Sequence, residues 1–173
     1  YLGEYAAHLP GRPNNIETAL AEALYLTSVE RNADVVRLAT YAPLFAHVDA
    51  WQWNPDLIWF DNLRMMRTPN YYVQQMYGMN AGTDVLNLQM DGKPVTGQDS
   101  LYASAVLDAP TGEVILKLVN AGSRSEKVQI EFSGSLSRVP APICKVMTGK
   151  PRIHWSRRLL FHVFVRWRWL PVL

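Results

Sequence analysis

The spacing of hydrophobic and polar residues changes about halfway along this chain of 173 residues. Between residues 15 and 80, apolar side chains recur every three or four positions, which is typical of helices packed on a core. From residue 85 to residue 132 they alternate with polar side chains, which is typical of strands. The change predicts a mainly helical part and then a mainly antiparallel one, with the boundary near residues 80–85.

Two helices are predicted in the first 45 residues. Residues 15–31 have apolar positions at helical spacing, and Asn14 or Asn15 can cap the first turn. Residues 34–45 repeat this spacing, although Pro43 is expected to kink or shorten the helix.

A buried strand and a further helix are predicted next. Residues 57–60 are four consecutive apolar residues, which fits a strand buried on both faces of a parallel sheet. The helix over residues 69–80 has Thr68 as its cap and Pro69 at its first position. Strands alternating with helices indicate an α/β sheet or barrel, whose remaining strands are expected upstream of Tyr1.

Short strands joined by tight turns are predicted after the boundary. The strands are residues 102–107, 113–120 and 127–132, and the turns are residues 108–112 and 121–123, both of which contain glycine. This arrangement is typical of an antiparallel meander or sandwich.

One carboxylate, Glu4, lies at the end of the strand expected to open the chain, between Gly3 and Tyr5. In α/β folds catalytic side chains are carried at this strand end, and a neighbouring phenol can orient a carboxylate by hydrogen bonding. The alternative is a solvated loop carboxylate, which is the commoner role of an exposed glutamate. His8 fits a loop position better than the lining of a site.

Three tryptophans and two polar residues are candidates for binding a sugar. Trp51 and Trp53 lie in a polar loop, whereas Trp59 lies in the apolar run. Aromatic faces stack on the apolar faces of sugars, but all three indoles fit a core role equally well. Asp61 and Asn62 follow the run, where they can bind sugar hydroxyls or cap the next turn.

Composition excludes some classes of site. A single cysteine, Cys144, rules out an intrachain disulfide and a zinc cluster, and the four histidines lack metal-ligand spacing, so no metal or cofactor is expected. The chain begins without Met and without a basic leader region, which indicates a processed chain or a fragment.

All fifteen acidic residues and nine basic ones lie in residues 1–131, whereas the last 42 residues hold eight basic residues and no acid.

Several segments, in order, resemble the C-terminal part of α-L-arabinofuranosidases of glycoside hydrolase family 51. They are residues 3–6, 30–36, 41–46, 51–53, 55–62 and 68–74, and the resemblance extends to about Gly134. It implies an α/β fold followed by an all-β one. Residues 1–82 would be the last strands and helices of a (β/α)8 barrel, with residues 57–60 as its eighth strand. Residues 83–150 would be an antiparallel β-sandwich, which is expected to be incomplete.

The resemblance also implies a function. Glu4 matches the nucleophile of a retaining hydrolase that releases terminal α-L-arabinofuranosyl residues from arabinose-containing polysaccharides or oligosaccharides. The acid/base glutamate is expected on an earlier strand, so this chain alone is expected to be inactive. The residues expected to bind substrate are Tyr5, Trp51, Trp53, Trp59, Asp61 and Asn62.

The expected setting follows from the same resemblance. No nucleic-acid or membrane partner is expected. The intact parent enzyme can be a homo-oligomer, and its expected location is extracellular or periplasmic. The alternative function is a non-catalytic carbohydrate-binding β-sandwich module. That alternative explains residues 85–134 but leaves Glu4 and the helices without a purpose.

Residues 151–173 depart from the family pattern. They are rich in arginine and tryptophan, a composition found in nucleic-acid and membrane binders, but neither role fits the acidic body of the chain. The apolar run of residues 159–165 is too short to span a bilayer. We expect this tail to be foreign to the family fold, for example from a shifted reading frame. Residues 153–173 are then expected to lie at the edge of the domain and to add no stability to residues 1–134.

Overall fold

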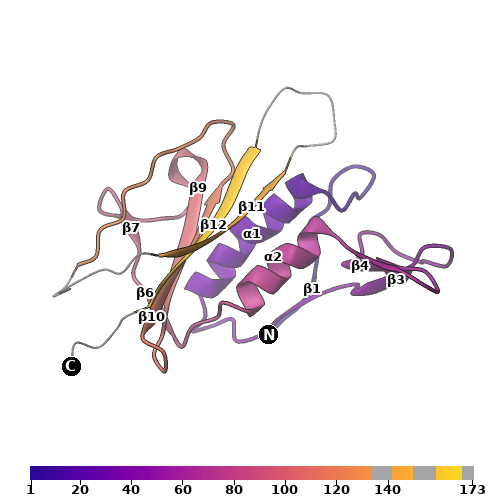
Figure 1. Ribbon diagram of the computed structural model, residues 1–173, viewed down its shortest axis with the longest axis horizontal. Coiled ribbons are helices and arrows are strands. Elements are labelled where there is room, and N and C mark those ends of the chain that lie inside the picture. Colours follow the sequence, from indigo (N-terminus) through magenta and orange to yellow (C-terminus); the bar gives the residue numbers. More distant parts are fainter. Residues whose placement is uncertain (134–141, 150–158, 169–173) are drawn as a thin grey trace.

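The computed structural model describes residues 1–133, 142–149 and 159–168, and this part of the chain is mostly β-structure with few helices. The helices are α1 (Ile16–Arg31), α2 (Pro69–Gly78) and the short 3-10 helix η1 (Gln98–Ser100). The strands are β1 (Leu2–Tyr5), β2 (Ala39–Tyr41), β3 (Phe45–His47), β4 (Ile58–Phe60), β5 (Met65–Arg67), β6 (Asp84–Leu86), β7 (Gln89–Met90), β8 (Lys93–Pro94), β9 (Leu101–Asp108), β10 (Glu113–Asn120), β11 (Ile143–Gly149) and β12 (Leu159–Arg168). Figure 1 shows α1 and α2 side by side across one face of the largest sheet.

The largest sheet is antiparallel throughout, with the strand order β11-β12-β10-β9-β6. Its centre is the β9–β10 hairpin, in which Leu101 pairs with Asn120 and Asp108 with Glu113. The turn between these strands contains Gly112, whose φ of +68° favours a residue without Cβ. The two strands and the turn predicted over residues 102–120 are therefore confirmed.

Both faces of β10 are covered. Val119 belongs to a core cluster with α1 and α2, so the odd-numbered side chains of β10 face the helices. Val114 and Leu116 belong to a second cluster on the opposite face. The first cluster contains Ala19, Leu20, Ala23, Leu26, Val73, Tyr77 and Val119; the second contains Val95, Ala103, Ala105, Val114 and Leu116. The sequence suggested one polar face for this strand, but Lys117, its central charge, is fully buried.

The two long helices begin where their caps predict. Asn15 accepts hydrogen bonds from the N–H groups of Glu17 and Thr18, both at 3.0 Å, and so satisfies the open first turn of α1. Thr68 does the same for α2 through the N–H of Tyr71 at 3.3 Å, with proline at the first helical position.

The helix predicted over residues 34–45 is wrong. Helix α1 ends at Arg31, and the side chain of the next residue, Asn32, donates to the carbonyl of Ser28 at 2.7 Å. The apolar spacing beyond does not face a core, since Val35 is 73% exposed and Leu38 58%. The chain instead turns back and forms β2 and β3, so the first 80 residues are not mainly helical.

The strand beside β1 is β2, not residues 57–60. β2 pairs in parallel with β1 after the α1 crossover, as consecutive strands of a β-α-β unit usually do. The strand predicted over residues 57–60 does exist as β4, but it lies in a separate sheet, parallel to β3 and antiparallel to β5. Its three residues are only partly buried, so the expected burial on both faces of a parallel sheet is wrong.

Residues 127–132 form no strand, although their alternation predicted one. Both edges of β10 are taken, by β9 and by β12, so this segment finds no partner there. Ile130 and Phe132 nevertheless pack on the second cluster. Alternation therefore predicted which side chains face the core, but not whether the backbone pairs.

Residues 159–168 form β12 inside the sheet, between β10 and β11, rather than at the expected edge. Its backbone pairs with β10 from Glu113 to Val119. The rest of the tail, residues 150–158 and 169–173, lies outside the described residues. Whether residues 153–173 add stability stays a prediction.

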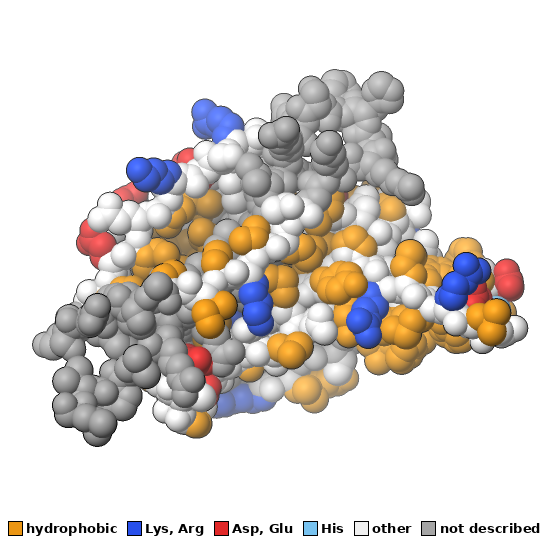
Figure 2. Space-filling view, in the orientation of Figure 1, with side chains coloured by type: hydrophobic (Ala, Val, Ile, Leu, Met, Phe, Trp, Pro, Cys, Tyr) orange, Lys and Arg blue, Asp and Glu red, His pale blue; other side chains and the backbone are white. Residues whose placement is uncertain are grey.

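The end of the molecule that carries β3, β4 and β5 has an apolar surface. Figure 2 shows hydrophobic side chains gathered there. Phe45, Leu63, Met65 and Met66 are 63%, 93%, 56% and 61% exposed. An exposed apolar patch of this kind marks a contact face.

Candidate active site

A pocket of about 330 Å³ opens at the carboxyl end of β1. Its lining consists of Glu4, Tyr5, Ala6, His8, Ala42, Pro43 and Trp53. The carboxyl ends of parallel strands meet at one edge, which brings the residues after β2 beside Glu4. Glu4 is exposed, and no other carboxylate appears among the residues that line this pocket. His8, which the sequence placed in a loop, lies in the lining as well.

Tyr5 anchors the end of β1 in the interior. Its hydroxyl donates to Oε1 of Gln74 at 2.7 Å, and its ring lies against Tyr25 and Tyr41, with centroids 5.6 and 5.8 Å away. Burial raises the pKa of Tyr5 to about 12. The hydroxyl is thus engaged by α2 rather than by Glu4, so orientation of Glu4 by this phenol is not seen.

Trp53 forms a wall of the pocket. The guanidinium carbon of Arg12 lies 4.0 Å from the centroid of its ring, and the ring of His8 lies at 6.2 Å. A guanidinium over an indole is a favourable cation–π contact. The loop after β1 therefore holds Trp53 in place, although its side chain remains 45% exposed.

A second pocket, of about 450 Å³, shares Pro43 and Trp53 with the first. Trp51 also lines it and packs edge-on against Trp59, with centroids 6.0 Å apart. Asp56 lies in the wall, where burial raises its pKa. Of the tryptophans proposed for sugar binding, Trp53 thus lies in the pocket of Glu4 and Trp51 in the pocket beside it.

Trp59, Asp61 and Asn62 lie outside both linings. The indole N–H of Trp59 donates to Asn14 at 3.4 Å. Asp61 accepts from the N–H groups of Leu63 and Arg64, both at 2.7 Å, and these bonds hold its pKa below the usual range. Of the two roles left open for Asp61, the structure shows the turn cap.

A buried polar cluster that was not predicted from the sequence lies behind the pocket. Glu22 of α1 is 2% exposed and accepts from the N–H of Ala7 at 3.0 Å, from Asn70 at 2.7 Å and from Gln74 at 3.3 Å. Burial raises the pKa of Glu22, and these three hydrogen bonds oppose that rise. The signal in the sequence was a glutamate within the apolar stripe of a helix, beside Ala19 and Ala23.

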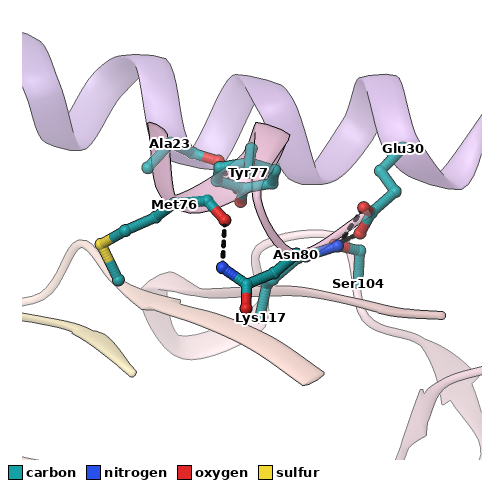
Figure 3. A network of polar contacts seen from close by, with 7 residues as sticks. All are labelled: Ala23, Glu30, Met76, Tyr77, Asn80, Ser104 and Lys117. Carbon is teal, nitrogen blue, oxygen red and sulfur yellow. Dashed lines mark hydrogen bonds and ion pairs between the residues drawn. The ribbon is translucent and has the colours of Figure 1, made fainter. Parts of the chain in front are cut away.

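A second buried network joins α1 to the large sheet, away from the pocket (Figure 3). Glu30 binds Lys117 of β10 and accepts from the hydroxyl of Ser104 in β9 at 2.6 Å. Tyr77 of α2 donates to the carbonyl of Ala23 at 2.8 Å. This network holds the helical layer to the sheet.

Two kinds of site are absent from the described part of the chain. No group of three or more His, Cys, Asp and Glu side chains there could hold a metal ion. No helix there is long and apolar enough to cross a membrane.

The chain resembles known proteins over most of its length. The family model described as "Alpha-L-arabinofuranosidase C-terminal domain" matches residues 3–151. α-L-Arabinofuranosidase 2 of Arabidopsis thaliana is 32% identical over 152 residues, which are 86% of this chain and 22% of that protein. The extracellular exo-α-L-arabinofuranosidase of Streptomyces chartreusis is 36% identical over 139 residues, 80% of this chain and 16% of that protein.

A solved structure has the same fold. It is an arabinose-bound α-L-arabinofuranosidase of family GH51, with a TM-score of 0.72 and 24% identity over 89% of this chain and 27% of the other. The chain spans only about a fifth of the length of the curated relatives. On the match to residues 3–151, the chain belongs to the α-L-arabinofuranosidase C-terminal domain family, which is found in GH51 enzymes.

Proposed function

We propose that this chain carries the catalytic nucleophile, Glu4, of a retaining glycoside hydrolase. The enzyme would release terminal α-L-arabinofuranosyl residues from arabinose-containing polysaccharides or oligosaccharides. One observation carries the proposal: Glu4 is an exposed carboxylate at a strand end, in a pocket walled by Trp53, within a chain of this family.

The chemistry needs a pair of carboxyl groups. In a retaining enzyme they lie about 5–5.5 Å apart: one attacks the anomeric carbon and the other protonates the leaving oxygen, then activates water. Glu4 takes the first role here, because an exposed carboxylate at a strand end can reach the anomeric carbon of a sugar in the pocket. The second carboxyl group would come from another part of a longer enzyme, and this chain alone would not turn over substrate.

The binding roles are proposals as well. Trp51 and Trp53 line the two pockets and offer their ring faces to sugar rings. Trp59 would support Trp51 from behind, and Asp61 and Asn62 would shape the turn beyond β4 rather than contact the sugar. Tyr5 would support Glu4 from the interior.

The architecture fits a larger assembly. The parallel β1-α1-β2 unit would belong to a (β/α)8 barrel, and the large antiparallel sheet to the adjoining β-sandwich. The apolar surface at β3–β5 would be covered by other parts of the parent enzyme. An extracellular location is supported by the name of the Streptomyces relative.

The test is a nucleophile replacement in the full-length enzyme that contains this chain. Glu4→Ala should abolish hydrolysis of an aryl α-L-arabinofuranoside, and azide or formate should restore part of it by taking the place of the carboxylate. Glu17→Ala, at an exposed position of α1, is the matched control and should keep full activity. Normal turnover by the Glu4→Ala enzyme would exclude Glu4 as the nucleophile.

A further inference from the structure

We propose that Glu22 is a positioning residue for the reaction: it fixes the backbone at the end of β1 and thereby the direction in which Glu4 points. The proposal rests on the proposed role of Glu4 as the nucleophile. It assigns a function to a buried carboxylate that does not itself line the pocket.

The end of β1 is held at two points, one on each side of Ala6. Oε1 of Glu22 accepts the N–H of Ala7 at 3.0 Å. Oε2 accepts from the amide of Gln74, whose own oxygen accepts the hydroxyl of Tyr5 at 2.7 Å. Successive side chains of a strand point to opposite faces, so fixing Tyr5 inside turns Glu4 outward to the pocket.

Glu22 is itself held in place. Nδ2 of Asn70 donates to its Oε1 at 2.7 Å, and Asn70 is fully buried. Oδ1 of Asn70 accepts in turn from Asn14 at 3.3 Å and from Thr18 at 3.4 Å. Movement of the Glu22 carboxylate would break its hydrogen bonds to Ala7, in the loop before α1, and to Asn70 and Gln74 of α2.

A carboxylate suits this position because all three of its neighbours are donors. An ionised carboxyl group only accepts, whereas a glutamine would bring its own donor against one of them. A buried charge is costly without such partners. The hydrogen bonds from Ala7, Asn70 and Gln74 supply them and are stronger because one member is charged.

The effect on the reaction follows from geometry. A nucleophile must lie about 3–3.5 Å from the carbon that it attacks, and a misplacement of about 1 Å can cost roughly 100-fold in rate. Sugar binding by the pocket walls does not depend on that distance. Loss of Glu22 should therefore lower kcat and leave KM nearly unchanged.

The experiment compares the buried Glu22 with the part-buried Glu30 of the same helix in the full-length enzyme. Glu22→Leu removes every acceptor, Glu22→Gln keeps one for Ala7, and Glu30→Gln disrupts the network that faces the sheet instead. With an aryl α-L-arabinofuranoside, Glu22→Leu should lower kcat roughly 10- to 100-fold. Glu22→Gln should recover part of that loss. Glu30→Gln should lower the melting temperature but keep kcat when assayed well below it.

Two results would overturn the inference. One is a normal kcat in both Glu22 variants. The other is a fall in kcat in Glu30→Gln that follows its loss of stability in the same proportion as in the Glu22 variants, because kcat would then depend on stability alone. If Glu22→Leu does not fold, the kcat of Glu22→Gln decides. Glu4→Ala in the same enzyme keeps the two proposals apart, because its normal turnover would remove the nucleophile assignment whatever the Glu22 variants do.

Discussion

Glu30→Gln should destabilise the chain strongly, because it leaves the ammonium group of Lys117 buried without its counter-ion. The Lys117 side chain is 0% exposed and that of Glu30 is 17% exposed. Breaking a buried pair by removing one partner costs about 3–5 kcal/mol. For a chain of 173 residues this corresponds to a fall in melting temperature of roughly 6–20 °C.

Lys117→Met is the matched variant. It removes the buried charge, fills similar space, and leaves Glu30 hydrogen-bonded to Ser104 at 2.6 Å. It should therefore cost less than half as much as Glu30→Gln, and the double variant should resemble Lys117→Met alone. Urea unfolding followed by circular dichroism measures all three free energies.

The pH dependence gives a second check on the same pair. Burial lowers the pKa of Lys117 below its usual 10.5, although Glu30 opposes the shift. The unfolded chain then binds more protons between the two pKa values, so Lys117 makes stability rise with pH in that window. Glu30→Gln lowers the folded pKa of Lys117 further, so the stability lost in this variant should shrink as the pH rises toward 10.5. Equal, pH-independent losses in Glu30→Gln and Lys117→Met would refute the reasoning.

Three further predictions concern the tail, the pocket wall and the buried acid. Because β12 pairs with β10, a chain ending at Gly149 should melt several degrees below one ending at Leu173, contrary to the expectation from the sequence; an equal melting temperature would support the foreign-tail hypothesis. In the full-length enzyme Trp53→Ala should raise KM for an arabinofuranoside several-fold. Trp59→Phe lies outside both pockets and keeps an aromatic ring against Trp51, so it should leave KM unchanged and cost about 1 kcal/mol of stability through the lost hydrogen bond to Asn14. Burial raises the pKa of Glu22 in the folded chain, so Glu22 contributes to the free energy of unfolding while it is protonated. This contribution is complete below the unfolded pKa near 4.5 and is lost as pH rises through the folded pKa. Urea unfolding should show that fall, and Glu22→Gln should abolish it.

Elements with a distinct start signal could be predicted from the sequence. Asn15 and the Thr68–Pro69 pair marked two helix starts correctly, because capping is decided by a few neighbouring residues. The β9–β10 hairpin followed from its alternation and its glycine turn. A strand of three residues, such as β2, is too short to show a clear alternation, and the apolar spacing around it was mistaken for a helix.

The candidate site could be predicted only in part. Glu4 and Trp53 were found because strand-end carboxylates and loop tryptophans stand out locally. Glu22, Asn70 and Gln74 were missed because their role depends on two helices meeting behind β1. No local pattern encodes that meeting.

Helix α1 carries one acid, the buried Glu22, toward β1 and another, the part-buried Glu30, toward the large sheet. Lys117 and Ser104 cannot be exchanged between relatives without leaving Glu30 unpaired and weakening the junction between α1 and the large sheet. Gly82 tightens the same junction, since a Cβ there would lie 2.6 Å from Val106. Recombination breakpoints placed between α2 and β6 should therefore yield chimeras of lowered stability unless α1, β9 and β10 come from the same parent.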